Sequence, residues 1–128
     1  MNQQASGSAS MVLVIDDEHL NRKLIRSFLG LEGIEVLEAG DAESGLAVAR
    51  SEDPDLILLD LRLPGMGGLE AMRILKADES TRTIPVLILS AGSLASDETQ
   101  FLAAGAAGLI LKPFSRQELV AAVRQVMG

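Results

Sequence analysis

Residues 11–18 of the chain read MVLVIDDE, so five apolar residues run directly into three acids. An apolar run of this length is typical of a strand that is buried on both faces of a parallel sheet. Such a strand has no structural need for carboxylates at its end, and neighbouring like charges repel one another. The stretch therefore predicts a buried strand that carries acidic side chains to one edge of a sheet for a functional reason.

Short apolar runs and amphipathic stretches alternate along the rest of the chain. Four further runs, also expected to be buried strands, are residues 34–37, 56–59, 84–89 and 109–111. Strand–helix alternation predicts parallel strands joined by right-handed crossovers, with helices on both faces of the sheet. The order is a β-strand followed by an α-helix, five times over, so we predict a single doubly wound α/β domain.

The helices between the strands are predicted from apolar residues at helical spacing. Four of them carry clear stripes, which are Leu20, Leu24, Phe28 and Leu31; Ala42, Leu46 and Ala49; Leu69, Met72 and Leu75; and Leu119, Ala122, Val123 and Val126. Asp41 is a candidate N-cap for the second helix, and Ser115 and Glu118 form a capping box before the fifth. The fourth helix has the weakest pattern and is expected within residues 94–104, with Gly105 as its stop.

Composition narrows the possible functions. The 128 residues fit one compact domain, in which we expect residues 1–10 to form a flexible N-terminal tail and residues 11–128 the folded unit. With a net charge of −7, direct binding to nucleic acid is not expected. The absence of cysteine removes thiolate metal sites, and no apolar run reaches the length of a membrane span. We therefore expect a cytoplasmic protein that does not contact a membrane.

Polar residues follow four of the five predicted strands at the point where each strand ends. They are Asp16, Asp17 and Glu18 after the first strand, Asp60 after the third, Ser90 after the fourth, and Lys112 with Pro113 after the fifth. The carboxyl ends of parallel strands meet at one edge of the sheet, where ligands bind in open α/β folds. The second strand ends in Glu38 and Ala39 and is expected to take no part.

Each of these residues also has a purely structural explanation. Asp17 can cap a helix, and Asp60 can start a turn. Ser90 and Lys112 can be ordinary solvated residues at strand ends. Taken together, those explanations must place three carboxylates, a hydroxyl and an ammonium group at one edge by accident. A joint binding site is the better explanation.

The charges at this edge point to a divalent cation. Asp16, Asp17 and Asp60 sum to −3, and Lys112 offsets one unit. A small number of oxygen ligands with room for water suits Mg²⁺ better than a soft metal. A site that combines Mg²⁺, one lysine and one hydroxyl can also hold a dianionic phosphoryl group.

Four stretches of the chain resemble the receiver domain of two-component response regulators, the family of the stand-alone chemotaxis response regulator. In chain order they are VLVIDDE (12–18), DLILLDLRLPGMGG (55–68), IPVLILSA (84–91) and AAGAAGLILKPF (103–114). The resemblance runs from Met11 to the C-terminus. It implies a flavodoxin-like fold with the strand order 2-1-3-4-5.

The resemblance implies roles for the acids. Asp60 is expected to be the phosphoacceptor, which carries the phosphoryl group as an aspartyl phosphate. Asp17 and Asp60 are expected to bind Mg²⁺ directly, as is the backbone carbonyl of Arg62. Asp16 is expected to act mainly through water.

The resemblance also implies roles for residues after the fourth and fifth strands. Lys112 is expected to pair with the phosphoryl oxygens, with the peptide bond to Pro113 in cis. Ser90 is expected to donate a hydrogen bond to a phosphoryl oxygen once one is present. The small side chain of Ala91 leaves a donor access to Asp60.

Partners follow from the same resemblance. A histidine kinase or a histidine phosphotransfer protein is expected to donate the phosphoryl group. An unknown protein target is expected to bind the surface formed by the fourth helix, fifth strand and fifth helix. Residues of the first helix, namely Asn21, Arg22 and Arg26, can contact the donor or form a plain solvated face. The chain is thus expected to be a signalling switch and not an enzyme.

Two positions depart from the pattern of the family. Receivers often carry Tyr or Phe three residues before the lysine, whereas this chain has Leu109, which has no ring to reorient on activation. Arg62 lies two residues past Asp60, near the expected path of attacking water, and is expected to change the lifetime of the phosphoryl group in a direction that the sequence leaves open.

Two other functions fit the sequence less well. A phosphatase of the haloacid dehalogenase type also uses an aspartate nucleophile and Mg²⁺, but such enzymes usually place a second aspartate where this chain has Arg62. A flavin carrier of the flavodoxin type needs a hydroxyl- and glycine-rich loop after the first strand and aromatic residues around the ring. This chain has acids in that loop and no Tyr or Trp.

Overall fold

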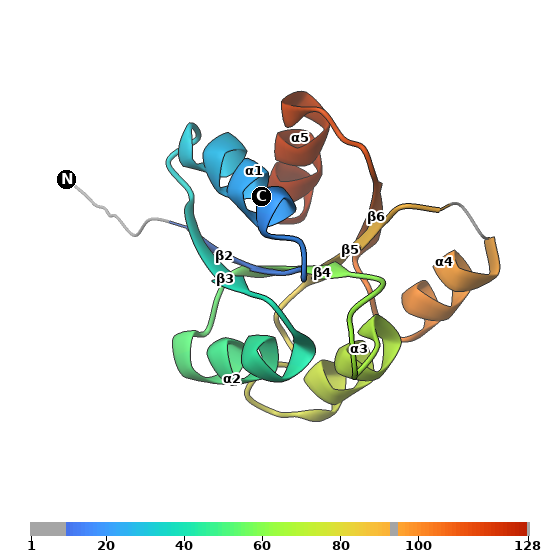
Figure 1. Ribbon diagram of the computed structural model, residues 1–128. Coiled ribbons are helices and arrows are strands. Elements are labelled where there is room, and N and C mark those ends of the chain that lie inside the picture. The colour runs from blue at the N-terminus through green and yellow to red at the C-terminus, as the bar shows by residue number, and fades with distance from the viewer. Residues whose placement is uncertain (1–9, 93–94, 128) are drawn as a thin grey trace.

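The computed structural model describes residues 10–92 and 95–127, which form a parallel sheet with helices on both faces (Figure 1). The strands are β2 (Met11–Ile15), β3 (Glu35–Ala39), β4 (Leu56–Asp60), β5 (Val86–Ser90) and β6 (Gly108–Leu111). The helices are α1 (His19–Gly30), α2 (Ala42–Glu52), α3 (Gly68–Ala77), α4 (Ala95–Ala103) and α5 (Arg116–Met127). The sheet order β3-β2-β4-β5-β6 is the predicted order 2-1-3-4-5 when strands are counted along the chain.

Two apolar cores fill the space between the sheet and its helices. Helices α1 and α5 cover one face, and α2, α3 and α4 lie on the other (Figure 1). Because alternate residues of a strand point to opposite faces, Val12 and Val14 enter the first core, and Leu13 and Ile15 enter the second. Every residue of β4 and β5 is buried, as their apolar runs predict.

The two edge strands depart from the prediction that all five strands are buried on both faces. Glu35 of β3 is exposed, and Leu111 of β6 is 56% exposed. Strand β3 also continues past the predicted run to Ala39, which pairs with Ile15 of β2. An edge strand has a neighbour on one side only, so it tolerates polar residues that a central strand excludes.

Helix α1 turns a different face to the sheet from the one predicted. Leu20 and Leu31 of the predicted stripe are 76% and 68% exposed, and the fully buried residues are Ile25 and Leu29. The apolar residues cover a broad arc of this helix, so their spacing alone did not determine which part of that arc is buried. In this orientation α1 turns the half-buried Asn21 toward the sheet edge, where it donates a hydrogen bond to Asp16.

The predicted helix ends are confirmed in three places. The Asp41 carboxylate accepts a hydrogen bond from the Ser44 N–H at 2.7 Å, so it caps α2. Ser115 and Glu118 exchange the two hydrogen bonds of a capping box. Gly105, at φ +108°, follows the end of α4. Residues 1–9 of the predicted tail lie outside the described residues, as does the region 93–94 just before α4.

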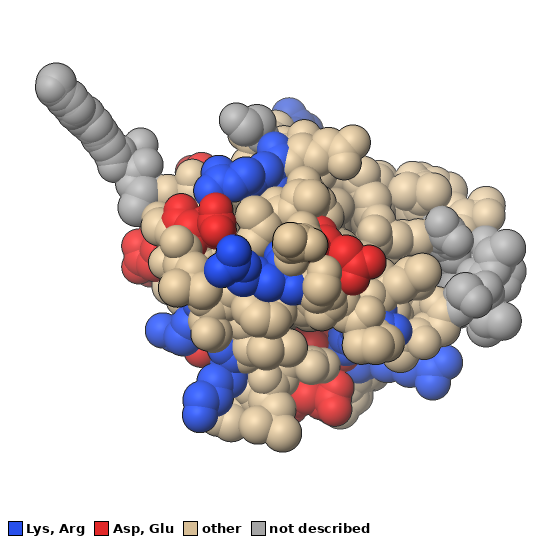
Figure 2. Space-filling model, turned by 90° about the horizontal axis from the view of Figure 1, so that it is seen from above, with Lys and Arg blue, Asp and Glu red and all other residues tan. Residues whose placement is uncertain are grey.

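The surface of the described residues is mixed in charge. On the face seen in Figure 2, basic and acidic side chains are interspersed with uncharged ones. Within the described ranges, no helix combines the length and apolar content needed to cross a bilayer. The face shown therefore offers no extended basic surface to a phosphate backbone.

Close packing between α2 and β2 yields a first prediction. A Cβ atom added at Gly45 would lie 2.6 Å from Cγ1 of Ile15, which is fully buried, and would contact its Cδ1 as well. We expect Gly45→Ala to lower the free energy of unfolding by about 1–2 kcal/mol, since overpacking outweighs the gain in helix propensity. Urea denaturation followed by circular dichroism measures the change.

The matched control is Gly30→Ala at the end of α1, where an added Cβ has no atom within 4 Å. It should leave stability unchanged or slightly raised. Equal effects of the two substitutions would show that contact with Ile15 is not the cause.

Candidate functional site

Three carboxylates meet at the carboxyl edge of the sheet. Asp16 directly follows β2, Asp60 ends β4, and the pairing of Ile15 with Leu59 places the two acids side by side. Asp16, Asp17 and Asp60 each offer one oxygen, and these oxygens all lie within 4.8 Å of one another. Asp16 and Asp60 are buried and Asp17 is exposed, so the cluster is open to solvent on one side. A few oxygen ligands with room for water suit Mg²⁺.

Lys112 reaches the acids from the end of β6. Its Nζ lies 3.3 Å from Oδ2 of Asp16 and 3.3 Å from Oδ1 of Asp60, and its side chain is only 15% exposed. Glu18 is farther away, at 4.0 Å. The structure therefore brings together Asp16, Asp17, Asp60 and Lys112, which lie at the ends of three different strands. One lysine faces three carboxylates, and this excess of negative charge fits a divalent cation.

Asp60 is the most strongly perturbed carboxyl group of the site. Burial raises its pKa from 3.8 to about 6, and the charge of Asp16 adds to the rise. Lys112 and the backbone N–H of Arg62, which donates to Asp60 Oδ1 at 3.2 Å, lower the pKa but do not cancel the rise. A raised pKa means that the ionised form of the carboxyl group is destabilised by its surroundings, so a nearby cation would stabilise that form.

Ser90 lies at the end of β5, next to the site, and is buried. Its hydroxyl donates to the carbonyl of Gly92 at 2.6 Å. The Gly92 N–H donates in turn to the hydroxyl oxygen of Ser90 at 3.3 Å. The hydroxyl is therefore engaged in a local turn in this state. Ala91 between them is exposed.

The remaining predicted residues lie around this edge. The peptide bond between Lys112 and Pro113 is cis, as expected. Arg62 is exposed, and Leu109 is partly buried against the core that contains α2, α3 and α4. Leu109 also lines a hollow of about 470 Å³ together with Leu111, Pro113, Phe114 and Glu118, among others.

Three polar residues join the site in ways that the sequence did not indicate. Asn21 Nδ2 donates to Asp16 Oδ2 at 3.3 Å and to Glu18 Oε1 at 2.8 Å, so Asn21 is part of the site and not a plain solvated residue. Arg22 donates to the backbone oxygen of Asp16 and to Glu38 of β3. The second strand, expected to take no part, therefore reaches the acidic turn through Glu38 and Arg22.

Comparison with known families gives one match that covers most of the chain. Residues 12–124 match the family described as "Response regulator receiver domain". The chain belongs to this family. The receiver domain is a signalling switch, and members of the family bind Mg²⁺ at the acidic site and interact with histidine kinases or phosphotransfer proteins and with downstream targets.

Two curated relatives illustrate the range of the family. The phosphate regulon transcriptional regulatory protein PhoB of Pseudomonas aeruginosa is 43% identical over 116 residues, which cover 91% of this chain and 51% of PhoB. The polar-differentiation response regulator DivK of Brucella ovis is 34% identical over 117 residues, 91% of this chain and 95% of DivK. The receiver domain thus spans about half the length of PhoB and nearly all of DivK.

Solved structures share the fold closely. The chemotaxis protein CheY4 of Vibrio cholerae has a TM-score of 0.89 at 28% identity, covering 93% of this chain and 99% of that one. The receiver domain of the sensor histidine kinase PA1611 of Pseudomonas aeruginosa has a TM-score of 0.87 at 30% identity, covering 94% and 99%. The PA1611 domain was crystallised with a magnesium ion coordinated in its active site cleft.

The raised pKa of Asp60 predicts a distinctive pH dependence of stability. The folded receiver domain holds this proton up to about pH 6, whereas the unfolded chain releases it near the ordinary pKa of 3.8. The contribution of Asp60 to stability therefore falls as the pH rises from about 4 to 6. With Mg²⁺ removed by EDTA, Asp60→Asn should be more stable than wild type by about 1–2 kcal/mol at pH 7, with little difference near pH 4.

Urea denaturation at both pH values, followed by circular dichroism, measures this difference. Carboxyl groups remote from the site are the same in both proteins, so their contributions cancel in the comparison. If Asp60→Asn is more stable than wild type by the same amount at both pH values, the charge of Asp60 is not the cause of the difference in stability.

Proposed function

We propose that this receiver domain, residues 11–128, accepts a phosphoryl group on Asp60 from a phosphohistidine partner and changes its binding surface as a result. The observation that carries this proposal is the position of the Asp60 carboxylate. It lies at the carboxyl edge of the sheet, 3.3 Å from Lys112 Nζ and within 4.8 Å of oxygens of Asp16 and Asp17. A nucleophile is thereby placed beside groups that can hold a cation and a phosphoryl oxygen.

The transfer is a displacement at phosphorus. An oxygen of the ionised Asp60 carboxylate forms the new P–O bond while the P–N bond of the phosphohistidine breaks. The electron pair of that bond returns to the imidazole ring of the donor. Lys112 donates to a phosphoryl oxygen, so it moves from a carboxylate partner to a phosphoryl partner without leaving the site.

The acids supply the ligands for Mg²⁺. Asp17 and Asp60 would bind it directly with the backbone carbonyl of Arg62, and Asp16 would act mainly through water. When bound, Mg²⁺ neutralises charge on the transferring phosphoryl oxygens. Asp16 is held for this task by hydrogen bonds from the Glu18 N–H at 2.9 Å and from Asn21.

Ser90 connects the phosphoryl group to the surface. Its hydroxyl leaves Gly92 and donates to a phosphoryl oxygen, which draws the local turn of Ser90 to Gly92 toward Asp60. The response reaches the surface formed by α4, β6 and α5, where Leu102 is 48% exposed and Leu111 is 56% exposed. Leu109 has no ring to swing inward, so this turn carries the response without an aromatic side chain.

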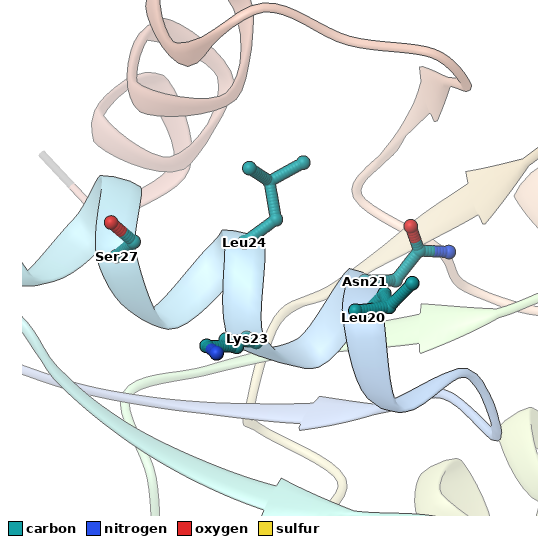
Figure 3. Close-up of a pocket in the computed structure, with 5 residues that line it drawn as sticks. All are labelled: Leu20, Asn21, Lys23, Leu24 and Ser27. Carbon is teal, nitrogen blue, oxygen red and sulfur yellow. The ribbon is translucent and has the colours of Figure 1, made fainter.

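The donor binds beside the acidic edge, along α1. A shallow hollow of about 450 Å³ runs along this helix and is lined by Leu20, Asn21, Lys23, Leu24 and Ser27 (Figure 3). Leu20 is 76% exposed and lies three residues past Asp17 in the chain. An exposed apolar patch with a polar rim is typical of a protein contact. We assign this surface to the histidine kinase or phosphotransfer protein that supplies the phosphoryl group.

Substitution of the phosphoacceptor tests the proposal. Incubated with acetyl phosphate and Mg²⁺, the wild-type protein should gain the mass of one phosphoryl group, and Asp60→Asn should gain none, because an amide cannot form the acyl phosphate. Mass spectrometry of the intact protein measures the gain. Asp53→Asn, the same change at the exposed C-cap of α2, is the matched control and should label as wild type does. Labelling of Asp60→Asn would refute the assignment.

Removal of the Ser90 hydroxyl should separate binding from response. In Ser90→Ala, Mg²⁺ with beryllofluoride, a mimic of the phosphoryl group, should bind roughly tenfold more weakly, since one hydrogen bond to a charged group is lost. At saturation, backbone NMR shifts at Asp17 and Leu61 should match those of wild type, and shifts in α4 should fall to less than about half.

The control for this experiment is Ser51→Ala. Ser51 on α2 also donates to a backbone carbonyl, that of Val48, but it is exposed and not part of the site. Its response to beryllofluoride should equal that of wild type. A full α4 response in Ser90→Ala would remove Ser90 from the signalling route.

A further inference from the structure

The guanidinium group of Arg22 joins the end of β3 to the backbone of the acidic turn. Arg22 Nη1 donates to the main-chain oxygen of Asp16 at 2.7 Å, and Nε donates to Glu38 Oε1 at 3.1 Å. The side chain is 17% exposed, so it lies mostly within the protein. We propose that Arg22, held by Glu38, is a positioning residue that fixes the turn between β2 and α1 so that Asp16 and Asp17 can hold Mg²⁺. This inference rests on the proposed function.

The turn is held at both polar backbone groups of Asp16. Its N–H donates to the carbonyl of Ala39 at 3.1 Å, and its carbonyl accepts from Arg22. The N–H is thus tied directly to Ala39 and the carbonyl is tied through Arg22 to Glu38, two consecutive residues at the end of β3. The carboxylate of Asp16 remains available to the site, where it accepts from Asn21 and Lys112. The backbone is thus anchored without use of the oxygens that face the ligand.

The need for an anchor comes from the acids themselves. Three acids follow one another at residues 16–18, and oxygens of Asp16 and Asp17 lie within 4.8 Å of an oxygen of Asp60. Repulsion favours any movement of the turn that separates them. A turn fixed at Asp16 resists that movement and keeps the oxygens close enough to share one cation.

Glu38 offsets the positive charge of Arg22. Its other oxygen, Oε2, accepts from Arg26 Nε at 2.6 Å. Burial acts to raise the pKa of Glu38, but the hydrogen bonds from Arg26 and Arg22 outweigh it and lower the pKa, so the group is ionised at neutral pH. A guanidinium beside a cation site would repel the cation, and the charge of Glu38 offsets that repulsion. Arg22 can therefore hold the turn without weakening the attraction of the acids for Mg²⁺.

The test compares Mg²⁺ affinity with stability in the same set of variants. We expect Arg22→Ala to bind Mg²⁺ about tenfold more weakly than wild type, which is typical when a residue that orients a metal ligand is lost. A Mg²⁺ titration followed by NMR shifts of the Asp17 and Leu61 amides measures the affinity. Urea denaturation without Mg²⁺ measures stability separately. Reduced stability at unchanged affinity would show that Arg22 only ties α1 to β3, and would overturn the proposal.

Arg26→Ala is the matched control. Arg26 pairs with the same Glu38 but is 58% exposed, and its Nε bonds only to Glu38, while Arg22 also reaches the turn. Because Arg22 alone still neutralises Glu38, Mg²⁺ affinity should stay within about twofold of wild type. A tenfold loss in Arg26→Ala would show that any change near Glu38 has this effect, and would also overturn the proposal.

Two conservative variants serve if Arg22→Ala does not fold. Arg22→Lys keeps the charge but cannot bridge two acceptors in one plane, and Glu38→Gln leaves the guanidinium uncompensated beside the acids. Each should weaken Mg²⁺ binding by roughly threefold to tenfold. Wild-type Mg²⁺ affinity in both variants would overturn the proposed role of Arg22. The proposed function would still stand in that case if Asp60 of the wild-type protein is phosphorylated. Absence of Mg²⁺ binding in the wild type would overturn both.

Discussion

Repulsion among three carboxylates is the constraint around which this domain is built. Asp16, Asp17 and Asp60 offer oxygens within 4.8 Å of one another, and at an effective dielectric of about 20 each ionised pair at this separation costs roughly 3 kcal/mol. The sheet withstands this cost because the acids follow its central strands, β2 and β4, which are buried and paired in register. Lys112 from β6 relieves part of it. The raised pKa of Asp60 shows that part remains for a cation to relieve.

Much of this arrangement could be predicted because its signals are local. Unbroken apolar runs predict buried strands, and parallel strands necessarily bring their carboxyl ends to one edge, so the amino-acid sequence alone was enough to predict Asp60 and Lys112 as neighbours. The capping box at Ser115 is equally local, since it depends on two residues three positions apart. The strand order needed the resemblance to receiver domains, because the spacing of apolar residues does not say which strands are neighbours.

The rest depends on contacts between distant residues. The buried face of α1 could not be read from its pattern, because Leu20 and Leu24 fit a helical stripe as well as the buried Ile25 and Leu29 do. The observed rotation places Asn21 beside Asp16, a contact that the spacing of apolar residues does not encode. Glu38 was left out of the predicted site for a related reason. Its charge sits at the end of an edge strand, and its value to the site depends on a guanidinium sixteen residues earlier in the chain.

Under the proposed function, the hydrogen bond from Ser90 to Gly92 has a consequence for the strength of the response to phosphorylation. A hydroxyl has one proton to donate, so the Gly92 carbonyl and the phosphoryl group compete for it. Once a phosphoryl group is present on Asp60, the free-energy gap between those two bonds would set what fraction of phosphorylated molecules adopts the signalling arrangement, with each 1.4 kcal/mol worth about a factor of ten. The balance between the two arrangements would thus be tuned in part at a backbone oxygen, where the stiffness of the turn acts as well as the chemistry of a side chain.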